Sequence, residues 1–229
     1  MLYLIYVYIY ELFKITHGGR TLKHKRSLWI AVTGLDGSGK TSLVENLKNM
    51  FEANGLSVYT DRLPHDQYIV KTLLDKSQDS YTDRLLFAVD NRLFGTELKE
   101  ILSSEEYDIV LTQRCWLDSF VHGAVQGFSY SWISELNRIS DLPQANILIH
   151  LVAESGIAYQ RICNDPEADK FEYPEYMARQ ERETRRAYRE IITGNTDLQW
   201  FFTANHIYLD TTQMTIQEVF EAVSAKLKF

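Results

Sequence analysis

The sequence predicts an α/β fold, a five-stranded parallel sheet with helices on both faces. Three observations support this prediction. Five short runs rich in apolar and β-branched residues recur along the chain, helical patterns separate them, and the glycine-rich stretch GLDGSGKTS (34–42) joins the first run to the first helix. Strands that alternate with helices form parallel sheets, whose ligands bind beyond the carboxyl ends of the strands.

The predicted strands are short and largely apolar, as expected of strands that are buried on both faces. The first is SLWIAVT (27–33), directly before the glycine-rich stretch. Four more strands are predicted at GLSVYT (55–60), YDIVLT (107–112), ANILIHLV (145–152) and HIYLD (206–210).

Helical patterns lie between these strands. After Gly39, apolar residues recur at helical spacing until a stop signal at 54–55. Longer patterns predict helices over 82–102 and 173–192. The last helix is expected to open with a Thr-x-x-Glu capping box at 215–218.

The 229 residues are expected to form one main domain (27–229) behind an N-terminal extension and linker (1–26). The first 13 residues are apolar and aromatic, but a bilayer-spanning helix needs about 20 apolar residues. No basic residue precedes Lys14, whereas a secretory signal begins with positive charge. We therefore expect no membrane association.

The composition argues against one further class of partner. The formal net charge of −7 does not suit a protein that coats nucleic acid, because such proteins need clustered excess Lys and Arg. Cys115 and Cys163 have no metal-ligand spacing. We expect them to be free thiols in a reducing, cytoplasmic compartment.

The stretch 34–42 satisfies the pattern G-x-x-x-x-G-K-[ST]. Between a strand and a helix this is a P-loop, whose backbone N–H groups hold phosphates at the N-terminus of the helix. Lys40 is expected to reach the β- and γ-phosphates, and the Thr41 hydroxyl to ligate Mg²⁺. The pattern therefore predicts a P-loop NTPase fold that binds ATP with Mg²⁺. The predicted ATP-binding residues are Gly34, Asp36, Gly37, Ser38, Gly39, Lys40, Thr41 and Ser42.

P-loops serve switches, motors, transporters and kinases, so residues after the other strands must identify the function. DRLPHD (61–66), RLLFAVDNR (84–92) and TQRCWLDSF (112–120) each carry an arginine near the predicted mouth of the cleft. Guanidinium groups match phosphate oxygens in a bidentate geometry. A second, phosphate-bearing substrate is therefore expected.

In these segments the chain resembles the thymidylate kinase family of nucleoside monophosphate kinases. GLDGSGKTS is similar to that family's P-loop, RLP (62–64) to its Arg-Phe/Glu-Pro turn, LLFAVDN (85–91) to its Leu-Leu-Phe-x-Ala-x-Arg helix, and QRC (113–115) to its Asp-Arg-Tyr. DKFE (169–172) and RRAYREI (185–191) resemble its lid and the helix that follows. The resemblance covers about 27–229.

The resemblance implies ATP-dependent phosphorylation of a nucleoside monophosphate, with dTMP converted to dTDP as the leading interpretation. It implies that Asp36 accepts a hydrogen bond from the acceptor's sugar hydroxyl, that Phe87 stacks on a pyrimidine and that Arg114 clamps the acceptor phosphate. The residues it assigns to substrate binding are Asp36, Arg62, Leu63, Phe87, Asn91, Arg92 and Arg114. A homodimer is an option, since the family commonly forms dimers through helices beside the sheet.

Phosphoryl transfer needs cations around the moving group rather than a general base, because the acceptor phosphate is already a nucleophile. Residues 35–38 of the P-loop supply no basic side chain. A small lid at about 161–172 is expected to supply Arg161 and Lys170 and to exclude water when closed. The predicted catalytic residues are Lys40, Arg114, Arg161 and Lys170.

Three departures from the family pattern concern the acceptor side. His65-Asp66 follows RLP where the family commonly has a further basic residue, and His122-Gly123 stands in place of the family's Tyr-Gln. Gln113 stands where the family has a carboxylate, so the local charge changes unless Asp118 substitutes. Asn91 stands in place of the helix arginine, and Arg92 comes one residue later, a step of about 100° on a helix. A kinase of another monophosphate, a deoxynucleoside kinase and a P-loop module that binds ATP without turnover therefore stay open.

Overall fold

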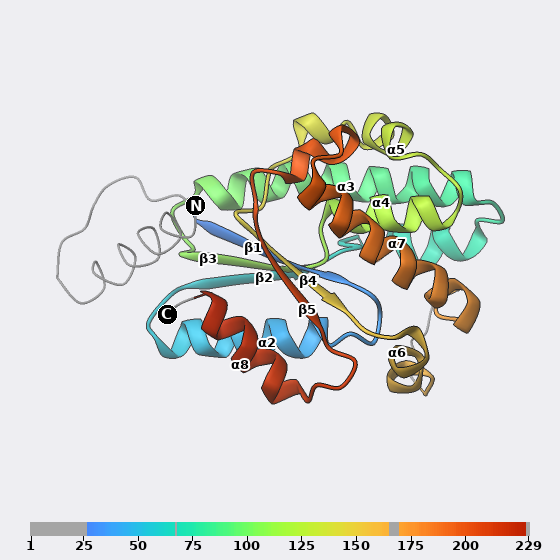
Figure 1. Ribbon diagram of the computed structural model, residues 1–229. Coiled ribbons are helices and arrows are strands. Elements are labelled where there is room, and N and C mark those ends of the chain that lie inside the picture. The colour runs from blue at the N-terminus through green and yellow to red at the C-terminus, as the bar shows by residue number, and fades with distance from the viewer. Residues whose placement is uncertain (1–26, 67, 165–169, 228–229) are drawn as a thin grey trace.

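The computed structural model describes residues 27–66, 68–164 and 170–227, so the predicted N-terminal extension (1–26) lies outside the described residues. Within the described part, five parallel strands form a sheet in the order β2-β3-β1-β4-β5 (Figure 1). The strands are β1 (Leu28–Gly34), β2 (Val58–Arg62), β3 (Ile109–Gln113), β4 (Ile147–Val152) and β5 (Asn205–Asp210). The predicted five-stranded parallel sheet is confirmed, and each strand starts within three residues of its prediction.

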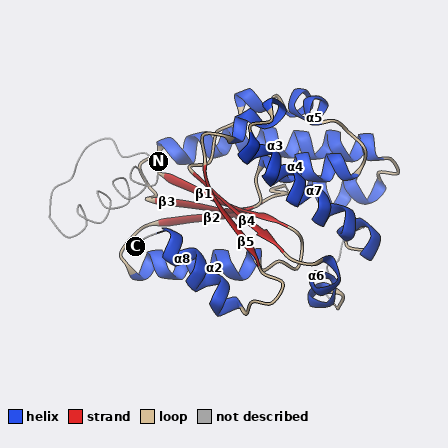
Figure 2. Cartoon of the chain, in the orientation of Figure 1, coloured by secondary structure: helices blue, strands red, loops and turns tan. Residues whose placement is uncertain are grey.

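Helices cover both faces of this sheet (Figures 1 and 2). They are α2 (Lys40–Ala53), α3 (Ser80–Ser103), α4 (Trp116–Val125), α5 (Tyr130–Asn137), α6 (Ser155–Ile162), α7 (Pro174–Thr193) and α8 (Ile216–Leu227). α2 and α8 lie on one face, and α3, α4, α5 and α7 lie on the other. The sequence patterns missed α4, α5 and α6, because helices of 10, 8 and 8 residues offer few turns of periodicity.

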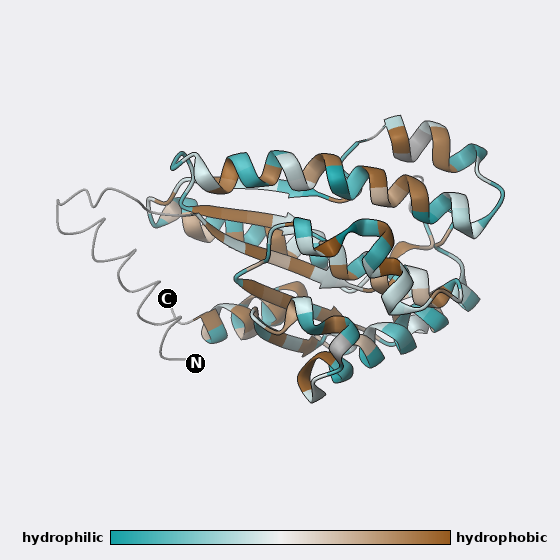
Figure 3. Cartoon of the chain, turned by 90° about the horizontal axis from the view of Figure 1, so that it is seen from above, coloured by the Kyte–Doolittle hydropathy of each residue, from teal (hydrophilic) through white to brown (hydrophobic). Residues whose placement is uncertain are grey.

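Strand β1 divides the core by simple alternation. Leu28, Ile30 and Val32 pack with α2 and α8, whereas Trp29 and Ala31 pack with the helices of the opposite face. The strands are therefore hydrophobic along most of their length (Figure 3). No helix in the described part of the chain is long and apolar enough to cross a bilayer.

The strand order reverses at β1, which lies between β3 and β4. In an open α/β sheet the crevice beyond this reversal is where ligands bind. The P-loop follows β1 and Arg114 follows β3, and the register pairs Val32 with Gln113. The Arg114 N–H donates to the Val32 carbonyl at 2.7 Å. The two segments predicted to bind phosphate therefore lie side by side.

The last residue of β1 must be glycine because β4 comes too close for any side chain. Gly34 has a φ of +139°, and a Cβ placed on it would lie 1.8 Å from the Leu151 carbonyl oxygen. Gly34 and Leu151 are register partners in the paired strands β1 and β4, so the atom in the way belongs to the backbone of the sheet. The chain therefore leaves the sheet at Gly34 without room for a methyl group.

We expect Gly34→Ala to lower the free energy of unfolding by more than about 4 kcal/mol, because the clash can be relieved only by separating two core strands. Gly39→Ala is the matched control, since Gly39 also has a positive φ (+95°) but a Cβ there meets no atom within 4 Å. The control should lose about 1–2 kcal/mol. Urea unfolding measures both, and equal losses would contradict this account of Gly34.

Candidate functional site

A cavity of about 950 Å³ opens at the carboxyl edge of the sheet. This volume is at the upper end for small-molecule sites and suits two nucleotides rather than one. Most of the residues predicted for binding or catalysis line it. They are Asp36, Gly37, Ser38, Gly39, Lys40, Thr41, Ser42, Arg62, Leu63, Phe87, Asn91, Arg114, Arg161 and Lys170.

Two predicted site residues, Gly34 and Arg92, are not among the residues that line the cavity, so their part in binding stays a prediction. Gly34 lies at the end of β1, where it is required by the contact with β4. Arg92 does not line the cavity, and its Nη1 lies 3.5 Å from Asp141 Oδ2. The physical reason is the helical step: Asn91 faces the cavity, so its successor on α3 is rotated by about 100°.

The P-loop is built to hold an anion. Gly39 adopts a left-handed conformation (φ +95°, ψ +17°) directly before α2, and no side chain caps the N-terminus of that helix. The first N–H groups of a helix have no partner within the helix and attract negative charge. The buried Ser38 hydroxyl likewise has no hydrogen-bond partner among the described residues. These donors fit a phosphate chain.

The P-loop lysine is buried against its own loop. Lys40 Nζ donates to the carbonyl oxygens of Gly34 and Leu35 and to Asp36 Oδ1, each at 2.9 Å. Burial lowers the pKa of Lys40, and the Asp36 carboxylate opposes that shift. The Lys40 ammonium group can therefore exchange the Asp36 carboxylate for a phosphate oxygen as its hydrogen-bond partner.

Arg114 reaches the same carboxylate from the other side of the crevice. Its Nη2 donates to Asp36 Oδ1 and its Nη1 donates to the Leu63 carbonyl at 3.0 Å. The backbone of Arg114 has a φ of +72°, a conformation that side-chain-bearing residues rarely adopt and that costs about 1–3 kcal/mol. The strained turn after β3 directs a guanidinium group into the cavity.

Asp36 therefore bridges two cations through one oxygen. Burial by itself would raise the pKa of this carboxyl group, but Arg114 and Lys40 together hold its pKa well below the ordinary value. Asp36 is ionised throughout the physiological pH range. The bridge brings the lysine of the P-loop and the arginine of the β3 turn together at one point of the cavity.

The metal-binding prediction rests on Thr41, whose hydroxyl donates to Gln113 Oε1 at 3.1 Å. Both oxygens are neutral, hard ligands of the kind that Mg²⁺ accepts when phosphates supply the charge. Asp118 also lies in the cavity wall, where its Oδ2 accepts the Cys115 N–H at 3.0 Å and caps α4. Among the described residues no group of three or more His, Cys, Asp or Glu side chains is placed to hold a metal ion.

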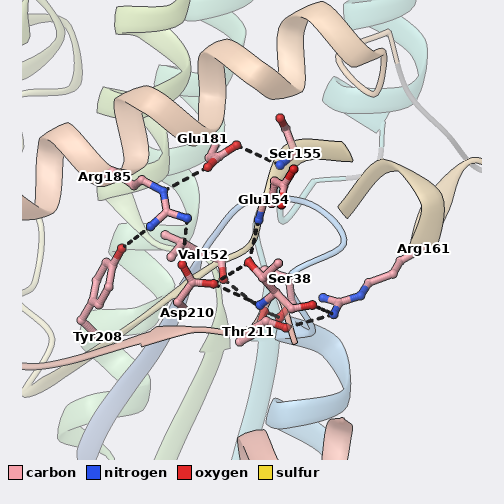
Figure 4. Close-up of polar contacts among 11 residues, drawn as sticks. Ser38, Val152, Glu154, Ser155, Arg161, Glu181, Arg185, Tyr208, Asp210 and Thr211 are labelled. Carbon is pink, nitrogen blue, oxygen red and sulfur yellow. Dashed lines mark hydrogen bonds and ion pairs between the residues drawn. The ribbon is translucent and has the colours of Figure 1, made fainter. Parts of the chain in front are cut away.

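Arg161 links the P-loop to the turn after β5 through hydrogen bonds (Figure 4). It donates to the Gly37 carbonyl at 3.1 Å and to the carbonyls of Thr211 and Thr212 at 2.9 and 3.1 Å. The Thr211 hydroxyl donates to the Ser38 carbonyl at 3.0 Å. Arg161 thus lies at the P-loop as predicted, but its guanidinium is engaged with backbone carbonyls.

Lys170, at the end of the predicted lid, reaches across the cavity to the opposite wall. Its Nζ contacts Asp83 Oδ1 at 2.7 Å and the Leu74 carbonyl at 3.1 Å. Residues 165–169 of the predicted lid lie outside the described residues. The ion pair links the lid to the beginning of α3.

Several polar residues outside the predicted site set also line the cavity, among them Arg84, Asp90 and His122. Arg84 lies on α3. Asp90 accepts the N–H groups of residues 65 and 66 at 2.9 and 2.6 Å, and so ties the loop after β2 to α3. His122 is buried, which lowers its pKa to about 3. The signal was available for Arg84 and Asp90, since each shares a helical face with Phe87 or Asn91.

Comparison with known proteins agrees with this geometry. The family model described as thymidylate kinase matches residues 32–220. A probable thymidylate kinase 1 of Saccharolobus solfataricus is 33% identical over 149 residues, 64% of this chain and 74% of that protein. A probable thymidylate kinase of Methanothermobacter thermautotrophicus is 28% identical over 186 residues, 78% and 86% of the two chains. The solved structure of thymidylate kinase from Candida albicans has the same fold, with a TM-score of 0.63, 15% identity and coverage of 87% and 90%.

We expect Asp36→Asn to lower the free energy of unfolding by about 3–5 kcal/mol at neutral pH, because two buried cations lose their shared anion. The folded-state pKa of Asp36 lies below its ordinary value of 3.8, so its stabilisation is complete above about pH 5 and is lost as pH falls through the folded-state pKa. Urea unfolding at pH 7, 5, 4 and 3 should show the difference between wild type and variant shrinking below pH 4. A difference that stays constant to pH 3 would refute this role of Asp36.

Proposed function

Because the chain belongs to the thymidylate kinase family, we propose that it transfers the γ-phosphoryl group of ATP to dTMP and releases dTDP and ADP. One observation carries the proposal: Lys40 and Arg114 contact the same oxygen, Asp36 Oδ1. The lysine belongs to the P-loop and the arginine to the turn after β3. A phosphate bound by Lys40 and a phosphate bound by Arg114 would therefore lie next to each other, beside the Asp36 carboxylate.

The reaction is an in-line displacement. An oxygen of the dTMP phosphate forms a bond to the γ-phosphorus, the bond from that phosphorus to the bridging oxygen breaks, and ADP leaves. No general base is required, because the attacking oxygen already carries negative charge. Lys40 neutralises the ATP phosphates and Arg114 orients the acceptor phosphate, so the chain contributes positioning and charge.

Asp36 has a second role once phosphates bind. Phosphate oxygens replace it as partners of Lys40 and Arg114, and its carboxylate is then available to a hydroxyl of the acceptor sugar. Phe87, on the α3 wall of the cavity, would stack on the base. Arg62 and Leu63 belong to the loop that leaves β2 and would close the phosphate end of the acceptor site.

The lid residues are proposed to change partners when ATP binds. The Arg161 guanidinium donates to a backbone carbonyl oxygen of Gly37, and the Lys170 ammonium group is paired with the Asp83 carboxylate. Both cations therefore have partners before a ligand binds. A triphosphate offers stronger, charged acceptors than a backbone carbonyl. Both cations would then serve the γ-phosphate, and the lid would exclude water.

Mg²⁺ is proposed to enter with ATP. Thr41 and Gln113 supply two neutral oxygens 3.1 Å apart beside the P-loop, which suits an ion whose remaining ligands are phosphates and water. The ion would neutralise charge on the β- and γ-phosphates. Gln113 makes this protein's contribution to metal binding weaker than a carboxylate would.

We propose a homodimer formed through α3. Tyr81, Leu85, Val89 and Leu93 recur every fourth residue on this helix and are 39–52% exposed, an apolar stripe that a second copy would cover. Light scattering should give twice the chain mass for the wild type and a lower mass for Leu93→Glu.

Cys115 and Cys163 are free thiols, which suits the cytoplasm as the site of action.

A kinase of another monophosphate is the second candidate, favoured by Gln113 and by Asn91 on the acceptor wall. Asn91 Nδ2 donates to Ser119 Oγ at 2.8 Å and to Asn137 Oδ1 at 2.7 Å, so its donors are satisfied by the protein. An ATP-coupled assay over a panel of monophosphates and nucleosides separates the candidates. Turnover with dTMP supports the proposal, turnover only with nucleosides selects a nucleoside kinase, and no turnover selects an ATP-binding module.

In that assay Lys40→Met should reduce turnover with every acceptor to background, because no other P-loop cation faces the triphosphate. Arg114→Met should raise the KM for dTMP by about 10- to 100-fold and leave the Kd for ATP within about threefold of wild type. The matched control is Arg92→Met, which removes a guanidinium outside the cavity. If Arg114→Met leaves the use of dTMP unchanged, the acceptor site has been misplaced.

Gln113→Asp should lower the Mg²⁺ concentration for half-maximal rate by about tenfold, because it adds one negative charge next to Thr41. Gln113→Asn has the same size as the aspartate variant and no charge, so it controls for the shortened side chain. Titration of the initial rate with Mg²⁺ at saturating ATP and dTMP provides the measurement. Identical titration curves for the two variants would rule out a metal beside residue 113.

A further inference from the structure

Arg185, on α7, uses every nitrogen of its guanidinium group to join two elements of the fold (Figure 4). Its Nε donates to Glu181 at 3.1 Å, its Nη1 to the Tyr208 hydroxyl at 3.0 Å and its Nη2 to Asp210 at 2.9 Å. Glu181 lies one turn earlier on α7, whereas Tyr208 and Asp210 belong to β5. The guanidinium therefore ties α7 to the end of β5.

Both carboxylates that Arg185 binds also support the start of α6, the helix that leads into the lid. Glu181 Oε2 accepts the Ser155 N–H at 2.8 Å. Asp210 Oδ1 accepts the Thr212 N–H at 3.1 Å and the Thr212 hydroxyl, and that hydroxyl oxygen accepts the Glu154 N–H at 2.9 Å. The first N–H groups of a helix lack partners within it, and the N-cap side chain of α6 supplies none. The start of α6 is therefore capped from α7 and from the turn after β5.

The other end of α6 carries Arg161, which lines the cavity. Two of the three carbonyl oxygens to which Arg161 donates belong to the turn after β5, the same turn that Asp210 orders. Arg185, Glu181 and Asp210 are not among the residues that line the cavity. Arg185 can therefore influence a ligand there only through the elements that it holds.

The charges in this network favour orientation over stability. The Arg185, Glu181 and Asp210 side chains are 32%, 20% and 43% exposed, and ion pairs so open to solvent contribute little to the free energy of unfolding. Without the guanidinium, however, two carboxylates would repel each other across the space that it fills. Each would then be drawn away from the backbone N–H group that it accepts. The cation therefore fixes the directions of Glu181 and Asp210.

We propose that Arg185 is a positioning residue for ATP binding, which acts by holding α6 and the turn after β5 in the places from which Arg161 serves the triphosphate. The inference rests on the proposed function and adds to it a residue outside the cavity. On the acceptor side, Arg114 is held by Asp36 and by the Leu63 carbonyl. Arg185 should therefore act on ATP and leave dTMP binding unaffected.

Titration calorimetry with ATP and with dTMP tests this assignment. Arg185→Met should raise the Kd of ATP by about tenfold and leave the Kd of dTMP within about twofold of wild type. Arg185→Lys keeps the charge but cannot bond both carboxylates and the tyrosine hydroxyl at once, so it should recover only part of the affinity. Arg186→Met is the matched control, because Arg186 also pairs with two carboxylates, Glu183 and Glu190, but both lie on its own helix. The control should change neither Kd.

A double variant tests the route through Arg161. Once Arg161→Met has removed the cation, the position of α6 no longer matters to the triphosphate. Adding Arg185→Met should then weaken ATP binding by no more than about twofold further. If the two losses multiply instead, Arg185 acts by another route and the proposal is overturned.

The comparison of the two ligands distinguishes positioning from general loss of structure. Equal increases in the Kd of ATP and the Kd of dTMP would overturn the proposal, as would an unchanged Kd of ATP. If Arg185→Met does not fold, Arg185→Lys provides the same comparison. ATP binding requires no turnover. A wild type that binds ATP without phosphorylating dTMP would therefore count against the proposed function, whereas ATP binding that is insensitive to Arg185 counts against this inference alone.

Discussion

The candidate site depends on one carboxylate that holds two cations, the buried Lys40 and the half-buried Arg114. Asp36 Oδ1 accepts from both Lys40 and Arg114, and without an anion at this point the two positive groups would repel each other inside the crevice. The bridge lets the chain fold with its phosphate-binding cations already in place. Phosphate oxygens can then replace Asp36 as partners of Lys40 and Arg114, so both cations keep an anionic partner when substrates bind. Preorganisation of this kind lowers the cost of positioning that phosphoryl transfer otherwise requires.

 The sheet topology explains why these groups meet. β1 and β3 are neighbours in space although their first residues, Leu28 and Ile109, are 81 positions apart along the chain. Register pairs Val32 with Gln113, and the Arg114 N–H bonds to the Val32 carbonyl, so the β3 turn is fixed to the strand that carries the P-loop. The left-handed backbone of Arg114 then turns its side chain toward Asp36. The parallel pairing of β1 with β3 therefore positions Arg114, and the glycine-rich loop positions Lys40.

Much of this could be predicted from the sequence, and the misses have physical causes. The three central strands are buried on both faces and leave continuous apolar runs, whereas the edge strands β2 and β5 are partly exposed and were found from shorter runs. The P-loop pattern pointed to Lys40 and Thr41, which line the cavity. Arg92, which the resemblance assigned to substrate binding, does not line the cavity, whereas Asn91 and Arg84 on the same helix do, as the step of about 100° per residue already indicated. The partners of Arg161 and Lys170 come from segments distant in the chain, and no local pattern encodes such contacts.

The account makes one structural claim above all others, that Lys40 and Arg114 leave Asp36 for two different phosphates. The most direct measurement is a crystal structure with a bisubstrate molecule in which adenosine and thymidine are joined by a chain of phosphates. The account predicts Lys40 Nζ on phosphate oxygens of the adenosine side, Arg114 on the phosphate nearest thymidine, and Asp36 facing the sugar. Lys40 and Arg114 both still bonded to Asp36, with the molecule bound in the cavity, would contradict it.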